Sequence, residues 1–340
     1  MKTGRDSLKT YSRWAIAGLI LGGLAESTLA HHSVLPFDQD KFSVLEGVIS
    51  EMRWRNPHIR LKLVVENEAG EKEEWEIEGG AANGIARKGL TGDDVSVGDR
   101  VRVGGWPSKL GRQELFVINL LLPDGRETIM LAGDHPLRWT EQRPEDVTAS
   151  ADADLERTIF RTWAFAEFYK PRTPFVFTAP AQAARAEWEP FTDMLAIQCI
   201  ASGMPNAILN PYPIEFIDEG DQIRLRIEEW EATRVIDMVL DQIPDDASRS
   251  LLGYSVGRWV DGVLVIETER IDFPYLDDDG TPMSEQAKLV ERFTVSDDGK
   301  RLDYEVSVSD PENLVEPATW DAAWKWVPGT KIMPFECDTD

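Results

Sequence analysis

Residues 251–271 read LLGYSVGRWVDGVLVIETERI, two runs rich in β-branched and aromatic residues on either side of Asp261-Gly262. Short runs of this composition are typical of β-strands. An Asp-Gly pair between two such runs favours a two-residue hairpin turn, because glycine readily adopts a positive φ. The stretch therefore predicts an antiparallel hairpin in the C-terminal half of the chain.

Similar strand-like runs flank this hairpin at short, regular spacing, at residues 213–220, 222–240, 288–296 and 301–309. Consecutive hairpins predict an up-and-down antiparallel sheet, and such a sheet tends to close when its edges are unprotected. We therefore expect residues 156–340 to form a lipocalin-like β-barrel, which can hold one small ligand. Residues 179–188 favour a helix with Pro180 in its first turn, and the spacing of Trp320 and Trp324 fits one helix face.

The preceding segment, residues 31–131, is also β-rich. Turn-forming residues separate five strand-like runs, and residues 81–88 favour a short helix. This pattern predicts a small barrel of the oligonucleotide/oligosaccharide-binding (OB) type, a fold that by itself does not define a function. Residues 132–155 lack periodicity and are expected to be a linker. The whole chain is thus expected to be mostly β, with an OB-like barrel followed by a larger lipocalin-like barrel.

Residues 1–30 are typical of a secretory signal peptide. Lys2, Arg5, Lys9 and Arg13 precede an uncharged run at residues 14–25 and a small-residue site at residues 28–30. The apolar run is shorter than the ~20 residues that span a bilayer. We expect cleavage after Ala30 and a periplasmic or secreted mature protein without a transmembrane segment. The alternative is an uncleaved N-terminal anchor.

The net charge limits the possible binding partners, and the cysteine content indicates a disulfide. The net charge of −25 argues against nucleic acids and anionic membrane surfaces as partners. The chain has two cysteines, Cys199 and Cys337, which an oxidising compartment would join in a disulfide. Two free thiols or a metal-binding pair are the alternatives.

Several short motifs occur in both halves of the chain's β-rich pattern and are distinctive enough to compare with known families. They include Ala30-His31-His32-Ser33 and Trp54-x-Asn56-Pro57-His58 in the first half, and Gly253-x-Ser255-x-Gly257-Arg258-Trp259 in the second. With these motifs the chain resembles an uncharacterised family of exported bacterial domains that is fused to a lipocalin-like C-terminal domain. The resemblance implies no chemistry. It also marks one departure, because the family tends to have histidine where this chain has Tyr254.

The first candidate site is a metal centre at the expected mature N-terminus. A free α-amine and imidazole at His31 would form a nitrogen chelate that suits Cu(II), and His32 or His58 could complete it. The alternatives are a flexible tail without metal, and a structural role in which His58 closes a turn by hydrogen bonding. His135, the fourth histidine, is expected at the surface.

The second candidate site is the interior of the larger barrel. Alternate strand residues face inward, so only one of Glu291 and Arg292 can line the interior. An inward arginine and an inward glutamate would have to pair, because unpaired buried charges are costly. The candidate ligand-binding residues are Trp230, Arg234, Tyr254, Arg258, Trp259, Glu267, Glu291 and Arg292. The alternative is that the charged residues among them face solvent or brace one end of the barrel.

Three functions remain open. The favoured hypothesis is a module that binds a small apolar or aromatic ligand in the second barrel. The second is an enzyme, either an isomerase, lyase or hydratase that uses Tyr254 and Glu291 as acid and base, or a copper-dependent redox protein. The third is an adaptor. Binding is favoured because the sequence offers no complete catalytic set. The Gly253-x-Ser255-x-Gly257 pattern lies in a strand rather than at a hydrolase elbow, and no histidine follows it.

Overall fold

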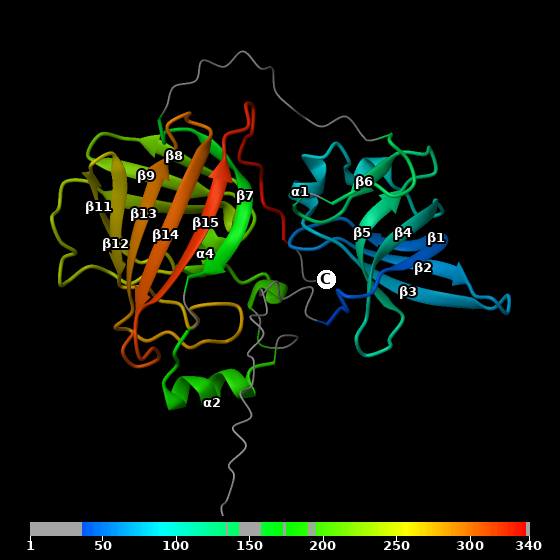
Figure 1. The fold of residues 1–340 in the computed structure, drawn as a ribbon, viewed down its shortest axis with the longest axis horizontal. Helices are drawn as coiled ribbons and strands as arrows, with labels where there is room; N and C mark the ends of the chain where they lie inside the picture. Colours follow the sequence, from blue (N-terminus) through cyan, green and yellow to red (C-terminus); the bar gives the residue numbers. More distant parts are fainter. Residues whose placement is uncertain are drawn as a thin grey trace, which may run out of the picture.

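The computed structural model describes residues 36–133, 135–142, 158–172, 175–189, 193 and 195–337. These residues form two β-barrels that lie side by side (Figure 1), which confirms the mostly β prediction. None of the helices in this part of the chain is long and apolar enough to cross a membrane. The expected signal peptide, His31 and His32 lie outside the described residues.

The first barrel has five closed strands and one additional short strand. Its sheet order is β3-β2-β1-β4-β5-β6, and β3 also pairs in parallel with β5, which closes the barrel. A short helix between β3 and β4 completes an OB-like arrangement, as predicted, whereas β6 was not expected. The elements are β1 (Ser43–Arg53), β2 (Arg60–Glu66), β3 (Lys72–Glu78), α1 (Ala82–Ala86), η2 (Gly92–Asp94), β4 (Arg100–Pro107), β5 (Glu114–Leu121) and β6 (Glu127–Ile129).

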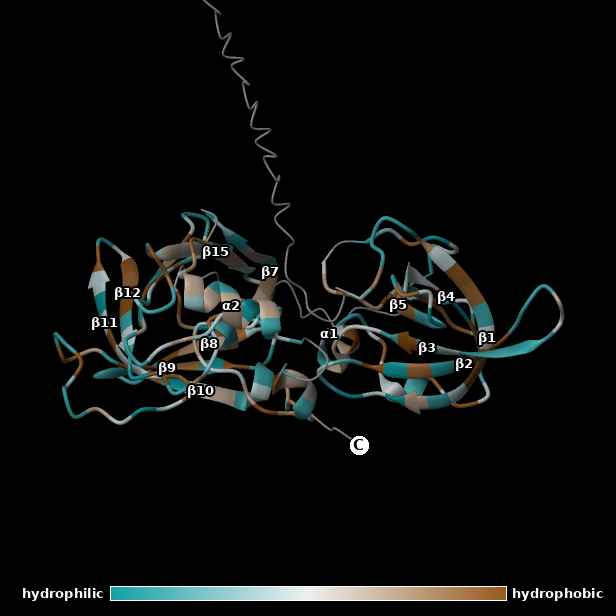
Figure 2. Cartoon of the chain, turned by 90° about the horizontal axis from the view of Figure 1, so that it is seen from below, coloured by the Kyte–Doolittle hydropathy of each residue, from teal (hydrophilic) through white to brown (hydrophobic). Residues whose placement is uncertain are grey.

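Alternation along the strands separates core from surface in this barrel. Leu61, Leu63 and Val65 of β2 are buried, and the residues between them are more exposed. Figure 2 shows this alternation as bands of hydrophobic and hydrophilic residues. Beyond β6, the chain stays attached to the barrel, because the buried Glu127 carboxylate accepts hydrogen bonds from the backbone N–H groups of Arg138, Trp139 and Thr140 at 2.8–3.1 Å.

The second barrel has nine strands, each paired with the next along the chain, and β15 pairs with β7 to close it. This arrangement confirms the lipocalin-like prediction. The strands are β7 (Thr162–Pro171), β8 (Ile214–Asp218), β9 (Gln222–Ile227), β10 (Ala232–Asp237), β11 (Tyr254–Val260), β12 (Val263–Glu269), β13 (Lys288–Val295), β14 (Arg301–Ser309) and β15 (Ala318–Lys325). The helices are α2 (Ala179–Glu187), η3 (Leu195–Gln198), α4 (Asn206–Leu209) and η4 (Glu229–Glu231).

The hairpin predicted from residues 251–271 is β11 and β12. Asp261 and Gly262 have φ values of 50° and 82°, the left-handed pair that a tight hairpin turn requires. The predicted helix at residues 179–188 is α2.

Three local predictions in the second barrel were wrong. Residues 222–240 form two strands rather than one, since the chain turns back at Trp230 and Glu231, which have φ values of 59° and 50°. The sheet is not antiparallel throughout, because the long connection after β10 returns the chain to the same end and β11 pairs with β10 in parallel. Trp320 and Trp324 lie in strand β15, where a separation of four also places both side chains on one face.

Large aromatic side chains fill much of the second barrel. Trp163, Phe216, Phe293, Tyr304 and Trp324 are buried in a single cluster. Phe293 packs on Tyr304 and on Phe216 with ring centroids 4.7 and 5.1 Å apart. The centre of the barrel is therefore a packed core, and any open volume must lie toward its wall.

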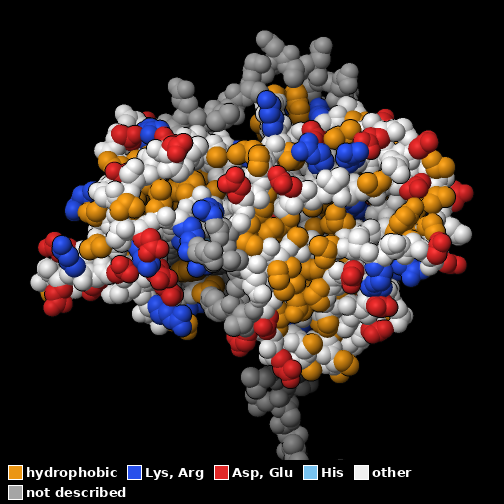
Figure 3. Space-filling view, turned by 180° about the vertical axis from the view of Figure 1, so that it is seen from behind, with side chains coloured by type: hydrophobic (Ala, Val, Ile, Leu, Met, Phe, Trp, Pro, Cys, Tyr) orange, Lys and Arg blue, Asp and Glu red, His pale blue; other side chains and the backbone are white. Residues whose placement is uncertain are grey.

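The last described residues run between the two barrels (Figure 1). The predicted disulfide is confirmed, because Cys199 and Cys337 are bonded with their Cα atoms 5.9 Å apart. Next to the disulfide, Asn56 of the first barrel forms a parallel bridge with Cys337. Around the edge of the back face, acidic side chains surround a hydrophobic area near the middle (Figure 3).

Candidate functional site

A buried polar cluster crosses five consecutive strands of the second barrel. Arg234 of β10 lies against Ser255 of β11, Thr268 of β12 and Glu291 of β13, and Tyr304 of β14 completes the set. All five residues are buried, and Arg234 is only 2 % exposed. Their side chains face inward because each occupies an inward position of its strand.

The arginine of this cluster has every N–H group occupied. Nε donates to Ser255 Oγ at 2.8 Å, and Nη1 donates to Glu291 Oε1 at 2.9 Å. Nη1 also contacts the Met204 sulfur at 3.9 Å, and Nη2 donates to Thr268 Oγ1 and Glu291 Oε2. The bidentate pair balances both buried charges, as burial of an ion pair requires.

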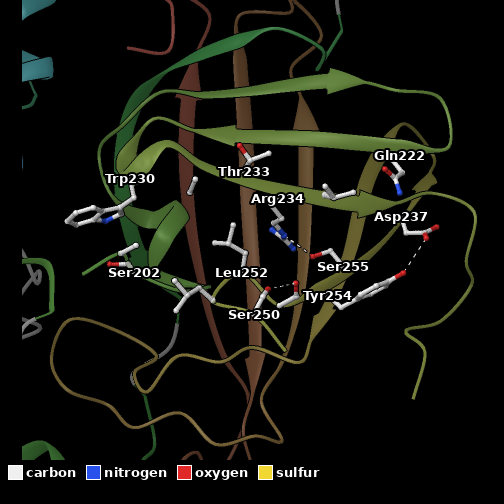
Figure 4. A pocket seen from close by; sticks show the side chains of 15 residues that line it. Ser202, Gln222, Trp230, Thr233, Arg234, Asp237, Ser250, Leu252, Tyr254 and Ser255 are labelled. Atoms are coloured by element: carbon white, nitrogen blue, oxygen red, sulfur yellow. Dashed lines mark hydrogen bonds between the residues drawn. The ribbon is translucent and has the colours of Figure 1, made fainter. Parts of the chain in front are cut away.

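A pocket opens beside this cluster, between β10 and β11 (Figure 4). The two strands pair only at Ile236 with Ser255 and at Asp237 with Val256, so they diverge on the other side of these pairs. The resulting cavity has a volume of about 650 Å³. Its apolar wall consists of Trp230, Ala232, Val235, Leu251 and Leu252.

Backbone geometry shapes the β11 side of the pocket. Gly253, which lines the cavity, has a φ of 71°, and a Cβ atom there would lie 2.6 Å from the Glu269 carbonyl oxygen. Only glycine adopts this positive φ without strain and has no Cβ atom to collide with the carbonyl oxygen. This turn directs the next residue, Tyr254, to the rim.

The rim carries a tyrosine and an aspartate. The Tyr254 hydroxyl donates to Asp237 Oδ2 at 3.4 Å (Figure 4). Hydrogen bonds from the backbone N–H groups of Leu240 and Val239 lower the pKa of Asp237. Burial, reinforced by the neighbouring Asp237, raises the pKa of Tyr254. At neutral pH the rim therefore has an ionised carboxylate and a protonated phenol.

At the opposite end of the pocket lies Trp230, which is backed by the disulfide-linked tail. The Trp230 ring packs on Phe335 with centroids 4.9 Å apart, and Phe335 packs on Tyr212 at 5.4 Å. Phe335 is two residues from Cys337, whose disulfide partner Cys199 precedes the pocket residues Ala201 and Ser202. The disulfide therefore joins the tail, which packs behind Trp230, to the segment that leads into the pocket wall.

The structure separates the sequence-predicted residues of the second barrel into two groups. Trp230, Arg234 and Tyr254 line the pocket, and Glu291 lies beneath Arg234. Three others point outward, because Arg258 pairs with Glu267 at 2.7 Å on the surface and Arg292 lies 3.8 Å from Glu305. Trp259 shares the strand face of Ser255 but lies near the end of β11, where it is 47 % exposed and packs against Phe160. Of the two adjacent residues, Glu291 faces inward and Arg292 outward.

The proposed acid and base are not brought together. Tyr254 bonds to Asp237, whereas Glu291 accepts from Arg234 and from the Tyr304 hydroxyl at 2.9 Å. Burial, with Glu291 as the next cause, raises the pKa of Tyr304 well above its usual value. The geometry thus offers no acid–base pair across the pocket from these two residues.

His58 lies in the first barrel, where its ring is near a backbone carbonyl and a carboxylate. His58 Nδ1 lies 3.0 Å from the Gly79 carbonyl oxygen and 3.9 Å from Glu78 Oε1. Within the described part of the chain, no group of three or more His, Cys, Asp and Glu side chains is placed to hold a metal ion. His31 and His32, which the copper hypothesis needs, lie outside the described residues.

A second buried carboxylate group lies next to η4. Glu229 Oε2 accepts from Asn210 Nδ2 at 2.7 Å, and Asp278 accepts from Asn206 Nδ2. Burial, together with nearby acids, raises the pKa of Glu229 to about 8 and that of Asp278 to about 7. The acids near Glu229 include Asp278 itself.

Sequence reasoning missed the polar residues that join the two barrels. The buried Glu228 carboxylate accepts from Asn83 Nδ2 at 3.2 Å, from Arg87, and from the backbone N–H of Met333 at 2.8 Å. Asn83 is itself held by Asn56, at 3.2 Å between their side chains. The Asn56-Pro57-His58 motif contains one residue of this network, Asn56. The motif alone could not identify Glu228, which lies about 170 residues later in the chain and joins Asn56 through Asn83.

Comparison with known proteins concerns the N-terminal part of the chain. A family of unknown function (DUF6152) matches residues 20–116. This match includes the Trp54-x-Asn56-Pro57-His58 motif and ends within β5. It confirms that the N-terminal part is similar to a domain of unknown function, whereas the fusion to a lipocalin-like partner stays a prediction. No curated protein matches the chain.

Proposed function

We propose that the protein binds a small, largely apolar molecule in the pocket between β10 and β11. One observation carries this proposal: two strands of an otherwise continuous barrel pair at only two positions and leave an apolar-walled cavity of about 650 Å³. Ligand pockets usually combine apolar walls with a few polar groups that orient the ligand. Here the polar groups are at the base and at the rim.

The packing of the barrel supports a site in the wall rather than at the centre. The central volume is occupied by Phe216, Phe293 and Tyr304, whereas Val235 and Leu251 at the pocket are 46 % and 40 % exposed. Large apolar side chains are costly to leave in water, so exposed ones beside a cavity favour an apolar occupant. The packed polar cluster below the pocket then provides a rigid base for that occupant.

We propose that this binding takes place outside the cytoplasm. The disulfide between Cys199 and Cys337 supports this location, because such bonds persist in oxidising compartments. The basic and apolar pattern of residues 1–30 is a separate argument for the same location.

Titration with the fluorescent apolar dye N-phenyl-1-naphthylamine tests the proposal on the disulfide-bonded protein that begins at His31. Binding should saturate at one dye per chain. Leu252→Trp and Ala232→Phe fill the cavity and should each weaken binding about tenfold or more. Val44→Trp adds a similar apolar side chain at a site in the first barrel that is 51 % exposed, and should leave binding unchanged. Equal binding by the filled variants, or no binding by the parent protein, would refute the proposal.

A further inference from the structure

We infer that the pocket accepts an uncharged ligand with one hydroxyl or carbonyl oxygen and discriminates against organic anions, although an arginine lies at its base. The inference rests on the proposed function and specifies its ligand class. It depends on three features: the Arg234 N–H donors that are all engaged, the carboxylate at the rim, and an unpartnered indole N–H at the far end of the pocket.

The first feature is that Arg234 has no free charge or donor to offer. Its three nitrogens already bond to Ser255, Thr268 and Glu291, and a buried carboxylate balances its charge. A ligand carboxylate would have to displace Glu291, which the Tyr304 hydroxyl also holds at 2.9 Å. Displacement would leave a second carboxylate buried without its partner, at a large cost in free energy.

The second feature is the charge at the mouth. Of the residues that line the pocket, Arg234 and Asp237 are the charged ones. Two backbone N–H groups, of Val239 and Leu240, hold Asp237 at 2.9 and 3.0 Å. With Arg234 matched by Glu291, Asp237 contributes an uncompensated negative charge at the rim. An anion therefore meets repulsion there in addition to the overall charge of −25.

The third feature is a polar point at the Trp230 end of the cavity. Ser202 lines the pocket and is only 4 % exposed. Trp230 also lines the pocket, and its indole N–H is buried without an acceptor among the described residues. Figure 4 shows both side chains at the same end of the pocket.

An unpaired N–H donor at this end of the pocket, beside a serine hydroxyl, favours a ligand oxygen. A buried donor without an acceptor costs free energy that a hydroxyl or carbonyl oxygen of a ligand would recover. The apolar wall between this end and the rim would hold the rest of the molecule. The chemistry therefore favours an alcohol, phenol or ketone with an apolar body over a fatty acid or another carboxylate.

Competition against N-phenyl-1-naphthylamine with naphthalene, 2-naphthol and 2-naphthoate tests the inference, because the three compounds share one apolar body. At pH 7, 2-naphthol should displace the dye at least about tenfold more effectively than 2-naphthoate. Ser202→Ala should weaken 2-naphthol about three- to tenfold, the usual value of one hydrogen bond, and leave naphthalene unchanged.

Two variants test the charge argument from the opposite direction. Glu291→Gln leaves Arg234 without its counter-charge and should increase the affinity for 2-naphthoate. Asp237→Asn removes the rim charge, avoids any change in the buried pair, and should increase it by about two- to fivefold. Circular dichroism checks that each variant is folded. The inference fails if the parent protein binds 2-naphthoate as tightly as 2-naphthol, whereas failure of the dye to bind refutes the proposed function itself.

Discussion

The Glu228 carboxylate, which follows β9 of the second barrel, pairs with the Arg87 guanidinium, which follows α1 of the first barrel. Glu228 is completely buried, and Arg87 is about one quarter exposed. The same two side chains also hold the tail, because Glu228 accepts from the Met333 N–H and Arg87 donates to the Lys331 carbonyl oxygen. One ion pair therefore joins both barrels and the segment between them.

Removal of the cation from this pair should destabilise the protein. Arg87→Met leaves the buried Glu228 charge with neutral donors only, and we expect a loss of about 2–3 kcal/mol in the free energy of unfolding, below the full buried-pair value because Arg87 is partly exposed. Urea denaturation measures the loss. Arg100→Met is the matched control, since Arg100 pairs with Glu46 at 2.9 Å on the surface and its loss should cost less than about 1 kcal/mol. Equal effects of the two substitutions would contradict a joining role for Glu228.

The disulfide should stabilise both the fold and the pocket. It closes a sequence separation of 138 residues, for which loop-closure entropy gives a stabilisation of about 4–5 kcal/mol. Replacement of Cys199 and Cys337 together by alanine should lower the urea midpoint accordingly. Because the released tail carries Phe335 away from Trp230, the same variant should also bind N-phenyl-1-naphthylamine more weakly. Unchanged dye affinity in a folded double variant would show that the tail does not shape the pocket.

The buried pair of Arg234 and Glu291 should show strong coupling. Arg234→Met alone leaves a buried carboxylate without its cation and should cost about 3–5 kcal/mol. Glu291→Leu alone should cost a similar amount. The double variant removes both charges, so its cost should be well below the sum of the two single costs, which urea denaturation of all four proteins measures. Additive costs would mean that the two side chains do not act as a pair.

Turns formed by glycine could be predicted from the sequence, and turns formed by other residues could not. Asp261-Gly262 predicted the β11–β12 hairpin because glycine adopts a positive φ without strain. The turn from β9 to β10 instead places Trp230 and Glu231 in the left-handed region. Tertiary contacts, including those of Glu228 with the first barrel, hold that turn. No local pattern reports such contacts, so residues 222–240 resembled one long strand.

The buried ion pair of the candidate site could be predicted in part from the sequence, and the pocket beside it could not. Strand alternation indicated that only one of Glu291 and Arg292 faces inward, and charge balance required an inward arginine as partner. The identity of that partner depends on barrel closure and register, which bring Arg234 next to Glu291 across 57 residues. The pocket was not predictable, because it results from the divergence of β10 and β11 after two residue pairs.

The buried carboxyl group of Glu229 should make the stability depend on pH. Burial raises its pKa from the ordinary 4.5 to about 8 in the folded protein. Between these values the unfolded chain has lost the proton while the folded protein keeps it, so stability falls as pH rises and levels off above about pH 8. Glu229→Gln removes this ionisation and can still accept from Asn210 through its amide oxygen. Its free energy of unfolding should match that of the parent protein near pH 4.5 and exceed it by roughly 2–4 kcal/mol at pH 8.

Asp278, with a pKa of about 7, adds a similar pH dependence of stability that remains in the Glu229→Gln variant. Glu231→Gln changes an exposed neighbour and should follow the parent protein at every pH. Urea denaturation at pH 5, 6.5 and 8 measures all three proteins, and a Glu229→Gln curve parallel to the parent curve would show that Glu229 is ionised in the folded state throughout this range.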